Sequence, residues 1–473
     1  MPDAPSLSRP APAIILTVLL PALLVIAALY DYYGHIQPDQ WITHFYNLLG
    51  EGFLAGHTWL PQEPSAELLA KANPYDPAQH RGLSLWDASL YHGKYYLYFG
   101  PVPALLLWMP VRLLTGMELS DNALGFGFAL IGTACLGWLL ASIATRLAVT
   151  SRLGLWIAVL TLGLASWLPF MLRRASVYEV AIAGAYGCSC MGLLLLWHGL
   201  RPQARHAPMR LALASLFFGL AVGCRLSHVF NIVVLIVAWV SMRQGRTARM
   251  SFMQAVWLFL PWGLCLMGLA AYNYARFDSV LESGIHYQLT FYNSRSPDFK
   301  MMQAARIIPN LYFYLFRPLP WRPDGQFPFV NVTGEDAIAL PGGIIASTYE
   351  PVYGLLTNCP FSLWLLAIPY GFAQRRVIGA QAGTILLAAA AYGFSMLGFM
   401  LLFFFATTRY AVDFAPWLMF LAGAMFLLVL SRARTTRERT LVLIAGGASA
   451  LYSIFNGTMS AYCGQYLCTA TGG

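Results

Sequence analysis

Charged residues are scarce in this sequence and unevenly spread. Asp, Glu, Lys and Arg make up only 10% of the 473 residues, whereas apolar residues make up 58%. Long stretches carry no charge, and the charges that occur are clustered between them. This pattern is typical of helical proteins that cross a membrane many times. We therefore expect one membrane domain over residues 1–473, where a soluble chain of this length would form several domains.

Several motifs that bind nucleotides or metals are absent as well. The sequence lacks a Gly-rich phosphate loop ending in Lys and Ser or Thr, a His-Glu-x-x-His helix, a Gly-x-Ser-x-Gly elbow and a Cys-x-x-Cys pair. The missing phosphate loop argues against a pump driven by nucleotide hydrolysis. No internal repeat is evident either. Because many secondary transporters have paired halves with broken helices, this argues modestly against transport.

Apolar segments near the roughly 20 residues needed to span a bilayer are abundant. The run Gly100–Leu114 has three prolines and predicts a juxtamembrane helix that lies in or dips into one leaflet. A short pair of segments predicts a thin hairpin with its tip at Arg225–His228. We expect an all-α membrane protein with about eleven transmembrane helices, over residues 13–30, 122–147, 153–172, 180–198, 211–224, 227–241, 251–275, 355–372, 378–405, 412–430 and 441–457.

The distribution of charge predicts the topology. Of the 29 lysines and arginines, 15 fall in the N-terminus and the short loops on one side of the proposed spans, with only two of the 20 acids. Short loops rich in arginine face the cytoplasm. We therefore predict a cytoplasmic N-terminus and a location in a bacterial inner membrane. The net charge of +9 reports this topology and does not indicate a nucleic-acid partner.

This topology assigns three large pieces to the periplasmic side: a first loop, residues 31–121, a second loop, residues 276–354, and a tail, residues 456–473. So long a first loop favours an enzyme that acts on a lipid-linked substrate at the membrane surface over a transporter or channel. Cys463 and Cys468 lie in the tail, where an oxidising compartment permits a disulfide. The sequence leaves open whether they form one.

Asp39 lies early in the first loop, ahead of an amphipathic stretch, Trp41–Ala55, with apolar residues at helical spacing. Asp39 would lie near the N-terminus of this helix. There it would act as the N-cap, as a general base at the membrane–water boundary, or as both. Glu51 lies within the same helix and is expected on its solvated face.

Asp87 and Lys94 lie in a segment with four tyrosines within eight residues. Two interpretations stay open. Tyrosines with a lysine are typical of an interfacial aromatic belt. They also suit a pocket for a sugar phosphate, because aromatic faces pack on the sugar ring and the lysine pairs with phosphate charge. The tyrosines that would line such a pocket are Tyr95, Tyr96 and Tyr98.

Ionisable residues also occur at the ends of later spans, where they are costly unless they face a cavity or a partner. Arg409 and Asp413 have the spacing of a helix-end ion pair. Alternatively, Arg409 or Arg225 binds an anionic head group. The other candidates for substrate contact at these ends are Glu179, His228, Tyr410 and Asp413.

With these elements in place, the sequence resembles the GT-C superfamily of integral membrane glycosyltransferases, especially the branch of protein O-mannosyltransferases and lipid A aminoarabinose transferases. The resemblance covers most of the chain. The matching elements are an acid soon after the first span, a surface helix ending in Gly52-Phe-Leu-Ala-Gly56-His, the segment Gly93-Lys-Tyr-Tyr-Leu-Tyr-Phe-Gly-Pro, the acid Glu179, and a late Arg-Tyr-x-x-Asp-Phe turn.

The resemblance implies a GT-C-like fold and a glycosyltransferase that uses a sugar carried on polyprenyl phosphate, usually with inversion. Its acceptor would be a periplasmic glycan, lipid or protein. By the same resemblance Asp39 is the general base, with Asp87 or Glu51 as alternatives, and Lys94 belongs to the donor site. We expect no obligatory metal, since phosphate is already a competent leaving group, although a divalent metal is compatible with the site.

Other functions stay open. A lipid-linked oligosaccharide flippase would move its substrate without forming a bond and would not need the acids of the first loop. An O-antigen polymerase or ligase would act on oligosaccharides and depend on arginines of the outer loops. A structural scaffold is disfavoured by the number of charged residues near membrane depth.

Overall fold

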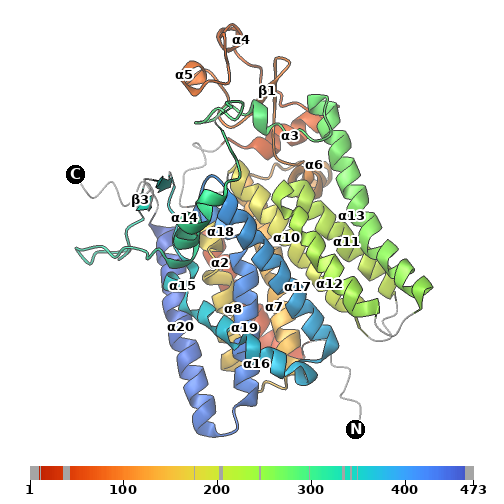
Figure 1. Ribbon diagram of the computed structural model, residues 1–473, viewed down its shortest axis with the longest axis vertical. Helices are drawn as coiled ribbons and strands as arrows, with labels where there is room; N and C mark the ends of the chain where they lie inside the picture. The colour runs from red at the N-terminus through yellow and green to blue at the C-terminus, as the bar shows by residue number, and fades with distance from the viewer. Residues whose placement is uncertain are drawn as a thin grey trace.

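The computed structural model describes residues 10, 12–35, 43–174, 176–201, 206–243, 247–297, 299–332, 336–340, 344–348 and 350–463. This part of the chain is mostly helical and contains two short β-hairpins. Figure 1 shows the long helices side by side in a bundle, with the small elements of the two large loops gathered at one end. We call this the loop end, and the opposite one the basic end.

Ten helical segments of the described residues are long and apolar enough to cross a membrane. Each corresponds to one of the predicted spans. In chain order they are Pro12–Gly34 (α1, η1 and α2), Asp121–Arg146 (α7), Arg152–Leu172 (α8 and α9), Val177–Gly199 (α10), Ala207–Cys224 (α11), Leu226–Arg243 (η4 and α12), Ala248–Phe277 (α13), Arg375–Leu402 (α17), Ala415–Arg432 (α19) and Thr436–Tyr462 (α20).

The remaining predicted span, residues 355–372, is a shorter apolar segment. It is divided into α15 (Leu355–Asn358), the 3₁₀ helix η8 (Pro360–Ala367) and α16 (Ile368–Ala373). Prolines at the start of η8 and of α16 favour a new helical turn at each point, because proline cannot donate a backbone hydrogen bond to the preceding turn.

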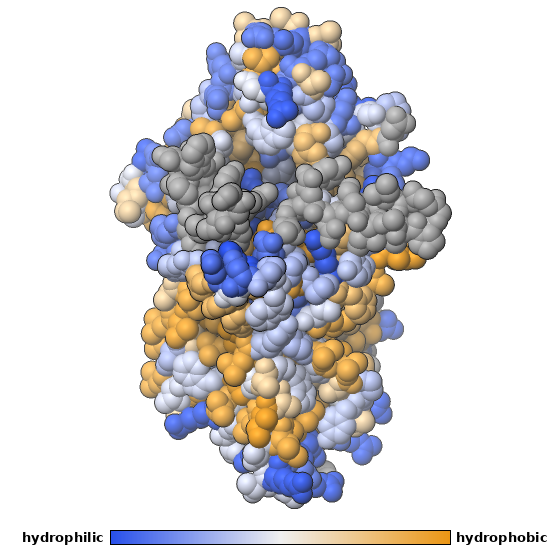
Figure 2. Space-filling view, turned by 90° about the vertical axis from the view of Figure 1, so that its left-hand side faces the viewer, coloured by the Kyte–Doolittle hydropathy of each residue, from blue (hydrophilic) through white to orange (hydrophobic). Residues whose placement is uncertain are grey.

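The helices differ in how much of their surface the protein covers. In α10 and α19, 83% of the apolar window is buried, whereas in α13 the share is 6%. The first two therefore lie in the centre of the bundle, and α13 lies at its edge against α11. Figure 2 shows a broad hydrophobic band on one face with hydrophilic residues at both ends, as expected of a surface that meets lipid.

The first loop is folded. It contains α3 (Phe45–Leu54), α4 (Ala66–Leu69), α5 (Pro77–His80) and a hairpin of β1 (Ser89–Tyr91) and β2 (Lys94–Tyr96). Both turn residues, His92 and Gly93, have positive φ, 46° and 70°, as a two-residue type I′ turn requires. The proline-containing run that follows forms a short apolar helix, Ala104–Thr115 (η3 and α6), as predicted.

The first loop packs tightly on the tip of the α11–α12 hairpin. A Cβ built on Gly100 would lie 1.9 Å from the carbonyl oxygen of Gly223 at the end of α11. Only glycine permits the two backbones to approach so closely. The hairpin tip itself is confirmed, because α11 ends at Cys224 and the 3₁₀ helix η4 (Leu226–Asn231) begins two residues later.

The start of the second loop contacts the first. Its elements are η5 (Ile285–Tyr287), η6 (Ala304–Arg306), α14 (Ile307–Leu311), η7 (Tyr312–Phe316) and the antiparallel strands β3 (Asp336–Leu340) and β4 (Ile344–Thr348). Two backbone hydrogen bonds join the loops: Asp87 N–H donates to Leu289 O, and Leu289 N–H donates to Ala88 O, each at 2.8 Å. The second loop thereby fixes the backbone around Asp87.

Candidate active site

Two arginines and a tyrosine meet at the loop end of the bundle. Tyr410 belongs to the single-turn helix α18 (Thr408–Ala411). The Cζ atoms of Arg225 and Arg409 lie 4.6 Å and 5.5 Å from its ring centroid. All three side chains are buried, and a desolvated guanidinium on an aromatic face is stabilised by roughly 0.5–2 kcal/mol. We refer to these three residues as the arginine cluster.

Arg409 is held by two carboxylates from distant parts of the chain. Its Nη1 lies 3.2 Å from Glu179 Oε1, and its Nη2 lies 2.9 Å from Glu350 Oε1. Glu179 has a second role at the start of α10, where its Oε2 accepts from the Ser176 hydroxyl and backbone N–H. The Thr407 hydroxyl donates to Glu350. Arg409 thus ties α10 to the second loop.

Arg225 extends from the hairpin tip and meets Asp413. The Arg225 Nε lies 3.1 Å from Asp413 Oδ2. Its N–H, however, points at the Ser227 hydroxyl, and Asp413 Oδ2 accepts no hydrogen bond from the described residues. The contact is therefore a charge interaction without a directed hydrogen bond. No hydrogen bond to the Arg225 Nη atoms occurs among the described residues, so both remain open to a ligand.

His228 continues this network into the protein core. Its Nε2 lies 3.1 Å from Asp413 Oδ1, and its Nδ1 is hydrogen-bonded to the Tyr392 hydroxyl. If Nε2–H donates to the carboxylate, Nδ1 is left to accept from Tyr392. Asp413 therefore has a cation on one oxygen and a hydrogen-bond donor on the other, as a buried carboxylate needs.

Asp87 is the acid of the first loop that approaches this cluster. Its backbone φ is 67°, a left-handed conformation that Asp tolerates better than most residues. Gln288 Nε2 donates to Oδ1 at 3.3 Å and also to the Tyr178 hydroxyl, and the Arg409 Cζ lies 4.3 Å from the Tyr178 ring centroid. Burial raises the pKa of the Asp87 carboxyl, opposed by hydrogen bonds from Thr290 and Tyr178 and by nearby arginines.

A small cavity lies beside Arg409. It has a volume of about 30 Å³ and is bordered by Arg174, Glu179, Glu350 and Thr407, which is room for ordered water and too little for a sugar. The buried Nε–H of Arg409 has no partner among the described residues. An unpaired buried donor is costly, and an oxygen atom of a ligand would satisfy it.

The other two predicted first-loop acids are not among the described contacts of the cluster. Asp39 lies outside the described residues. The helix after it begins at Phe45 with His44 as N-cap, later than predicted, so the interpretation of Asp39 as the cap of this helix is wrong. Glu51 is exposed on α3, as expected for a solvated face.

Lys94 is placed away from the arginine cluster. Its Nζ lies 3.4 Å from Glu63 Oε1, and both side chains are substantially exposed. The same ammonium lies 5.9 Å from the Trp59 ring centroid. These contacts are within the first loop, so a role of Lys94 in binding donor phosphate stays a prediction without support from its surroundings.

The three tyrosines of the hairpin segment separate. The Tyr95 hydroxyl accepts from the Leu85 backbone N–H at 3.1 Å inside the first loop, and Tyr96 packs on Phe277 at the end of α13. Only Tyr98 lies beside the site, with its ring centroid 6.1 Å from that of Tyr178. Successive strand residues point to opposite faces, which explains the different surroundings of the first two.

Of the two alternatives for Arg409 and Asp413, the ion pair between them is wrong. Spacing of four residues brings side chains together only on a continuous helix. Here α18 ends at Ala411 and α19 begins at Ala415, so the two residues lie on a broken turn. Each finds its partner on another element instead, as described above.

Four residues of the site were not predicted from the sequence: Glu350, Tyr178, Gln288 and Thr290. Glu350 stands a few residues before the predicted span 355–372, the same relation that Glu179 has to its own span, and this parallel was the available signal. The other three carry no signal in the sequence, since their roles come from contacts between the two loops.

No group of three or more His, Cys, Asp or Glu side chains among the described residues is arranged to hold a metal ion. In the tail, Cys463 is disulfide-bonded, and Cys468 lies outside the described residues. The cysteines at 135, 188, 190, 224, 265 and 359 are free.

Comparison with known proteins gives a result for the fold and none for the sequence. No family model matches the chain, and no curated protein matches it. Among solved structures, the oligosaccharyltransferase of Archaeoglobus fulgidus matches in its apo form and, as AglB, in complex with an inhibitory peptide and a dolichol-phosphate. Each match has a TM-score of 0.51 at 13% identity and covers 94% of this chain and 56% of the archaeal one.

A second similar structure is ArnT from Cupriavidus metallidurans bound to undecaprenyl phosphate, at a TM-score of 0.44 and 13% identity, covering 95% of this chain and 77% of that one. The match to the archaeal transferase, by contrast, covers little more than half of that protein's length. The chain has a GT-C-like polytopic helical membrane fold, as the sequence resemblance predicts.

Proposed function

We propose that the chain is a membrane glycosyltransferase that moves a sugar from a polyprenyl-phosphate donor to a hydroxyl of a glycan, lipid or protein on the periplasmic side of a bacterial inner membrane. The fold match over 94% of the chain supports the class. A dolichol-phosphate complex of the archaeal relative supports a polyprenyl-phosphate ligand.

The open Nη atoms of Arg225 are the observation that carries the proposal. Two parallel N–H donors match the oxygens of a phosphate, and Arg225 has its charge oriented by Asp413 and its stem held at a buried turn. Arg409 adds a second positive charge and an unpaired Nε–H. Together they would stabilise the negative charge that grows on the phosphate as it leaves.

A groove for the isoprenoid tail adjoins this site. It has a volume of about 400 Å³ between the first loop and the helices α11 and α13. Gly223, which lines it, stands two residues before Arg225. A lipid phosphate at Arg225 would thus have its tail on apolar surface. The other lining residues are Phe53, Pro101, Val102, Leu105, Gly219, Leu220, Cys265, Gly268, Leu269 and Tyr272.

In this mechanism the acceptor oxygen attacks the anomeric carbon, and the bond from that carbon to the phosphate oxygen breaks. The bonding pair leaves with the polyprenyl phosphate, and a carboxylate takes the hydroxyl proton. We propose Asp87 for this role, because its hydrogen-bonded partner Tyr178 lies against Arg409. Asp39 is the alternative that the family resemblance implies. Attack from the face opposite the phosphate would invert the anomeric centre.

A transfer assay tests the proposal. Membranes containing wild-type protein, Arg225→Gln or Asp87→Asn would receive a panel of radiolabelled polyprenyl-phosphate sugars, with Glu51→Gln as the matched acid control on the exposed face of α3. We expect label in a delipidated product from the wild type and the control only. Label that crosses the bilayer without a new bond would instead identify a flippase, and transfer of whole oligosaccharides would identify a polymerase or ligase.

A further inference from the structure

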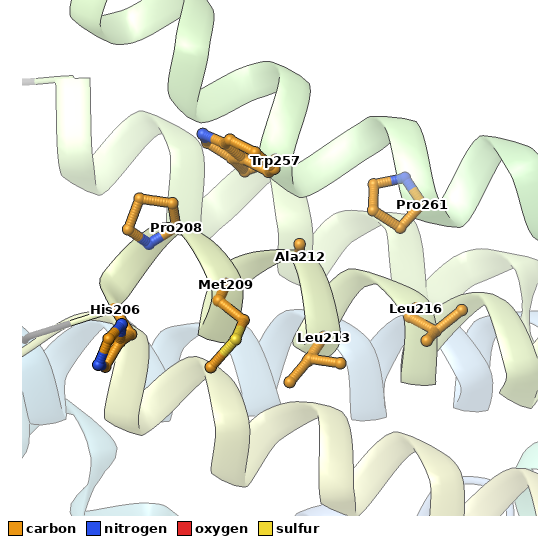
Figure 3. Close-up of a pocket in the computed structure, with 8 residues that line it drawn as sticks. All are labelled: His206, Pro208, Met209, Ala212, Leu213, Leu216, Trp257 and Pro261. Carbon is orange, nitrogen blue, oxygen red and sulfur yellow. The ribbon is translucent and has the colours of Figure 1, made fainter.

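A second groove lies at the basic end of the bundle, at the opposite end of α11 from Arg225. Its volume of about 500 Å³ is within the roughly 300–1,000 Å³ typical of ligand sites. Figure 3 shows its side chains on the first turns of α11 and on the facing stretch of α13. His206 is at its mouth, and the remaining lining residues are apolar: Pro208, Met209, Ala212, Leu213, Leu216, Trp257 and Pro261.

On the loop-end side of the groove, α11 and α13 are in close contact. There the Trp262 backbone N–H donates to the Ser215 hydroxyl at 3.0 Å, and a Cβ added to Gly219 would lie 2.6 Å from the Cβ of Cys265. Pro261 has no N–H to donate to the carbonyl four residues earlier. The groove begins where this contact ends and runs toward the N-termini of both helices.

The groove opens toward the region that lipid would occupy. Only 6% of the apolar window of α13 is buried inside the protein, and Met209 and Trp257 of the groove wall are 55% and 37% exposed. Because both helices belong to the candidate spans, surface exposed between them meets acyl chains, and an extended apolar chain matches its lining.

Positive charge lies near the His206 end of the groove. No aspartate or glutamate occurs between Glu179 and Asp278. Arg210, one turn after His206, donates from Nη1 to the His198 carbonyl at 3.3 Å; its guanidinium carries five donors, more than this contact uses. Basic pockets between transmembrane helices bind anionic lipid head groups. Among the described residues, Arg243 at the end of α12 and Arg249 in the first turn of α13 are exposed at this end as well.

We propose that this groove binds one anionic phospholipid. An acyl chain lies along the row from Met209 to Leu216, against Trp257, and the phosphate is held at the mouth by Arg210 and His206. The charge near this end of the groove selects an anionic head group over a zwitterionic one. This inference goes beyond the proposed function and does not depend on it, because the site is at the other end of the bundle.

Native mass spectrometry of the purified full-length protein tests the proposal, with phosphatidylglycerol and phosphatidylcholine as the probes. We expect one retained phosphatidylglycerol on the wild type and clear preference over phosphatidylcholine. Ala212→Trp fills the groove and should weaken retention at least about tenfold. Arg210→Gln removes one charge and should weaken phosphatidylglycerol alone, by about fivefold. Met267→Trp on the lipid-facing side of α13 and Arg437→Gln on α20 are the matched controls.

Three results would overturn the proposal. Equal retention of both lipids would show that the groove does not select an anionic head group. Unchanged retention in both Ala212→Trp and Arg210→Gln would show that the lipid does not bind in this groove. A dimer that Ala212→Trp dissociates would show that a second copy of the chain occupies the groove. Because Arg210→Gln removes the charge but keeps a side chain that can still donate to the His198 carbonyl, it decides the question even if the tryptophan variant fails to fold. Sugar transfer is not the readout, so loss of the proposed function would not affect this test.

Discussion

The two ends of the α11–α12 hairpin use arginine in opposite ways. At the tip, Arg225 is buried against Asp413 and Tyr410. At the other end, Arg243 of α12 is exposed, as is Arg249 in the first turn of the next helix, α13, in a stretch of sequence without acids. A buried arginine needs a partner for its charge, whereas an exposed one remains hydrated. Arginine at the tip is therefore constrained by its buried charge partners, whereas arginine at the other end can be replaced at little cost to folding.

Replacing a paired arginine at the loop end should have the largest effect. Arg409→Gln leaves Glu179 and Glu350 without their shared cation, and breaking a buried pair from one side costs about 3–5 kcal/mol. We expect a large drop in the thermal unfolding midpoint of the purified protein, together with loss of transfer. Arg249→Gln at the basic end should change unfolding by no more than about 0.5 kcal/mol.

A double variant sharpens this test. If the cost arises from unpaired carboxylates, adding Glu179→Gln to Arg409→Gln should recover part of the lost stability without restoring transfer. Equal unfolding midpoints for Arg409→Gln and Arg249→Gln would contradict the distinction between the two ends.

Asp87 should affect activity more than stability. A general base contributes roughly 10²–10⁴ in rate, so Asp87→Asn should lower kcat by about that factor. Because burial raises the pKa of the folded carboxyl, its charged form is the costly one, and neutral Asn should not destabilise the fold at neutral pH. Asp39→Asn, measured in the same assay, distinguishes the two candidate bases, since only the true base should show the full loss.

The pH dependence of the transfer rate tests the role of Asp87 independently of the variants. A base is active only when deprotonated, so transfer by the wild type should fall as pH drops through the raised pKa of Asp87. Over the same interval protonation removes the cost of the buried charge, so the Asp87 contribution to folding becomes more favourable as pH falls. A rate that stays flat down to the ordinary aspartate pKa, about 3.9, would exclude Asp87 as the base.

Much of the fold could be predicted from the sequence, because lipid exposure forces apolar runs of spanning length. The hairpin tip at Arg225 and the short proline-containing helix within the first loop were predicted in the same way. The partners at the site could not be. Arg409 meets Glu179, 230 residues away, and Glu350 through the fold of the second loop, and no local pattern encodes such pairs.

The error over Arg409 and Asp413 has the same origin. Their spacing is informative only on a continuous helix, and the break between Ala411 and Ala415 has no strong signal except Pro416 in the next turn. Asp87, by contrast, was recognised as a candidate acid, while its position depended on backbone pairing with Leu289. Local patterns therefore identified functional residue types, and long-range packing decided which of them meet.

Close packing at the hairpin tip should make it less tolerant of added volume than α13. Gly100→Ala places a Cβ against the Gly223 backbone oxygen, and overpacking of this kind costs about 1–3 kcal/mol. Gly268→Ala in α13 meets nothing within 4 Å and should be neutral or slightly stabilising, since alanine is the better helix former. Unfolding midpoints of the two variants measure the difference, and matching values would show that the first loop yields at this contact.

The smallest effect is expected at Lys94, where the charge is exposed although the residue lies in the first loop. Its pair with Glu63 is open to solvent, and exposed ion pairs contribute roughly 0–1 kcal/mol. We expect Lys94→Gln to leave the unfolding midpoint nearly unchanged and to change kcat/KM for the polyprenyl-phosphate donor by less than about fivefold. Arg225→Gln in the same assay should reduce it far more. If Lys94→Gln instead raised KM as strongly as Arg225→Gln does, the lysine would have to contact the donor phosphate in the working enzyme. Lys94 would then have to leave Glu63 and move toward the arginine cluster during the reaction.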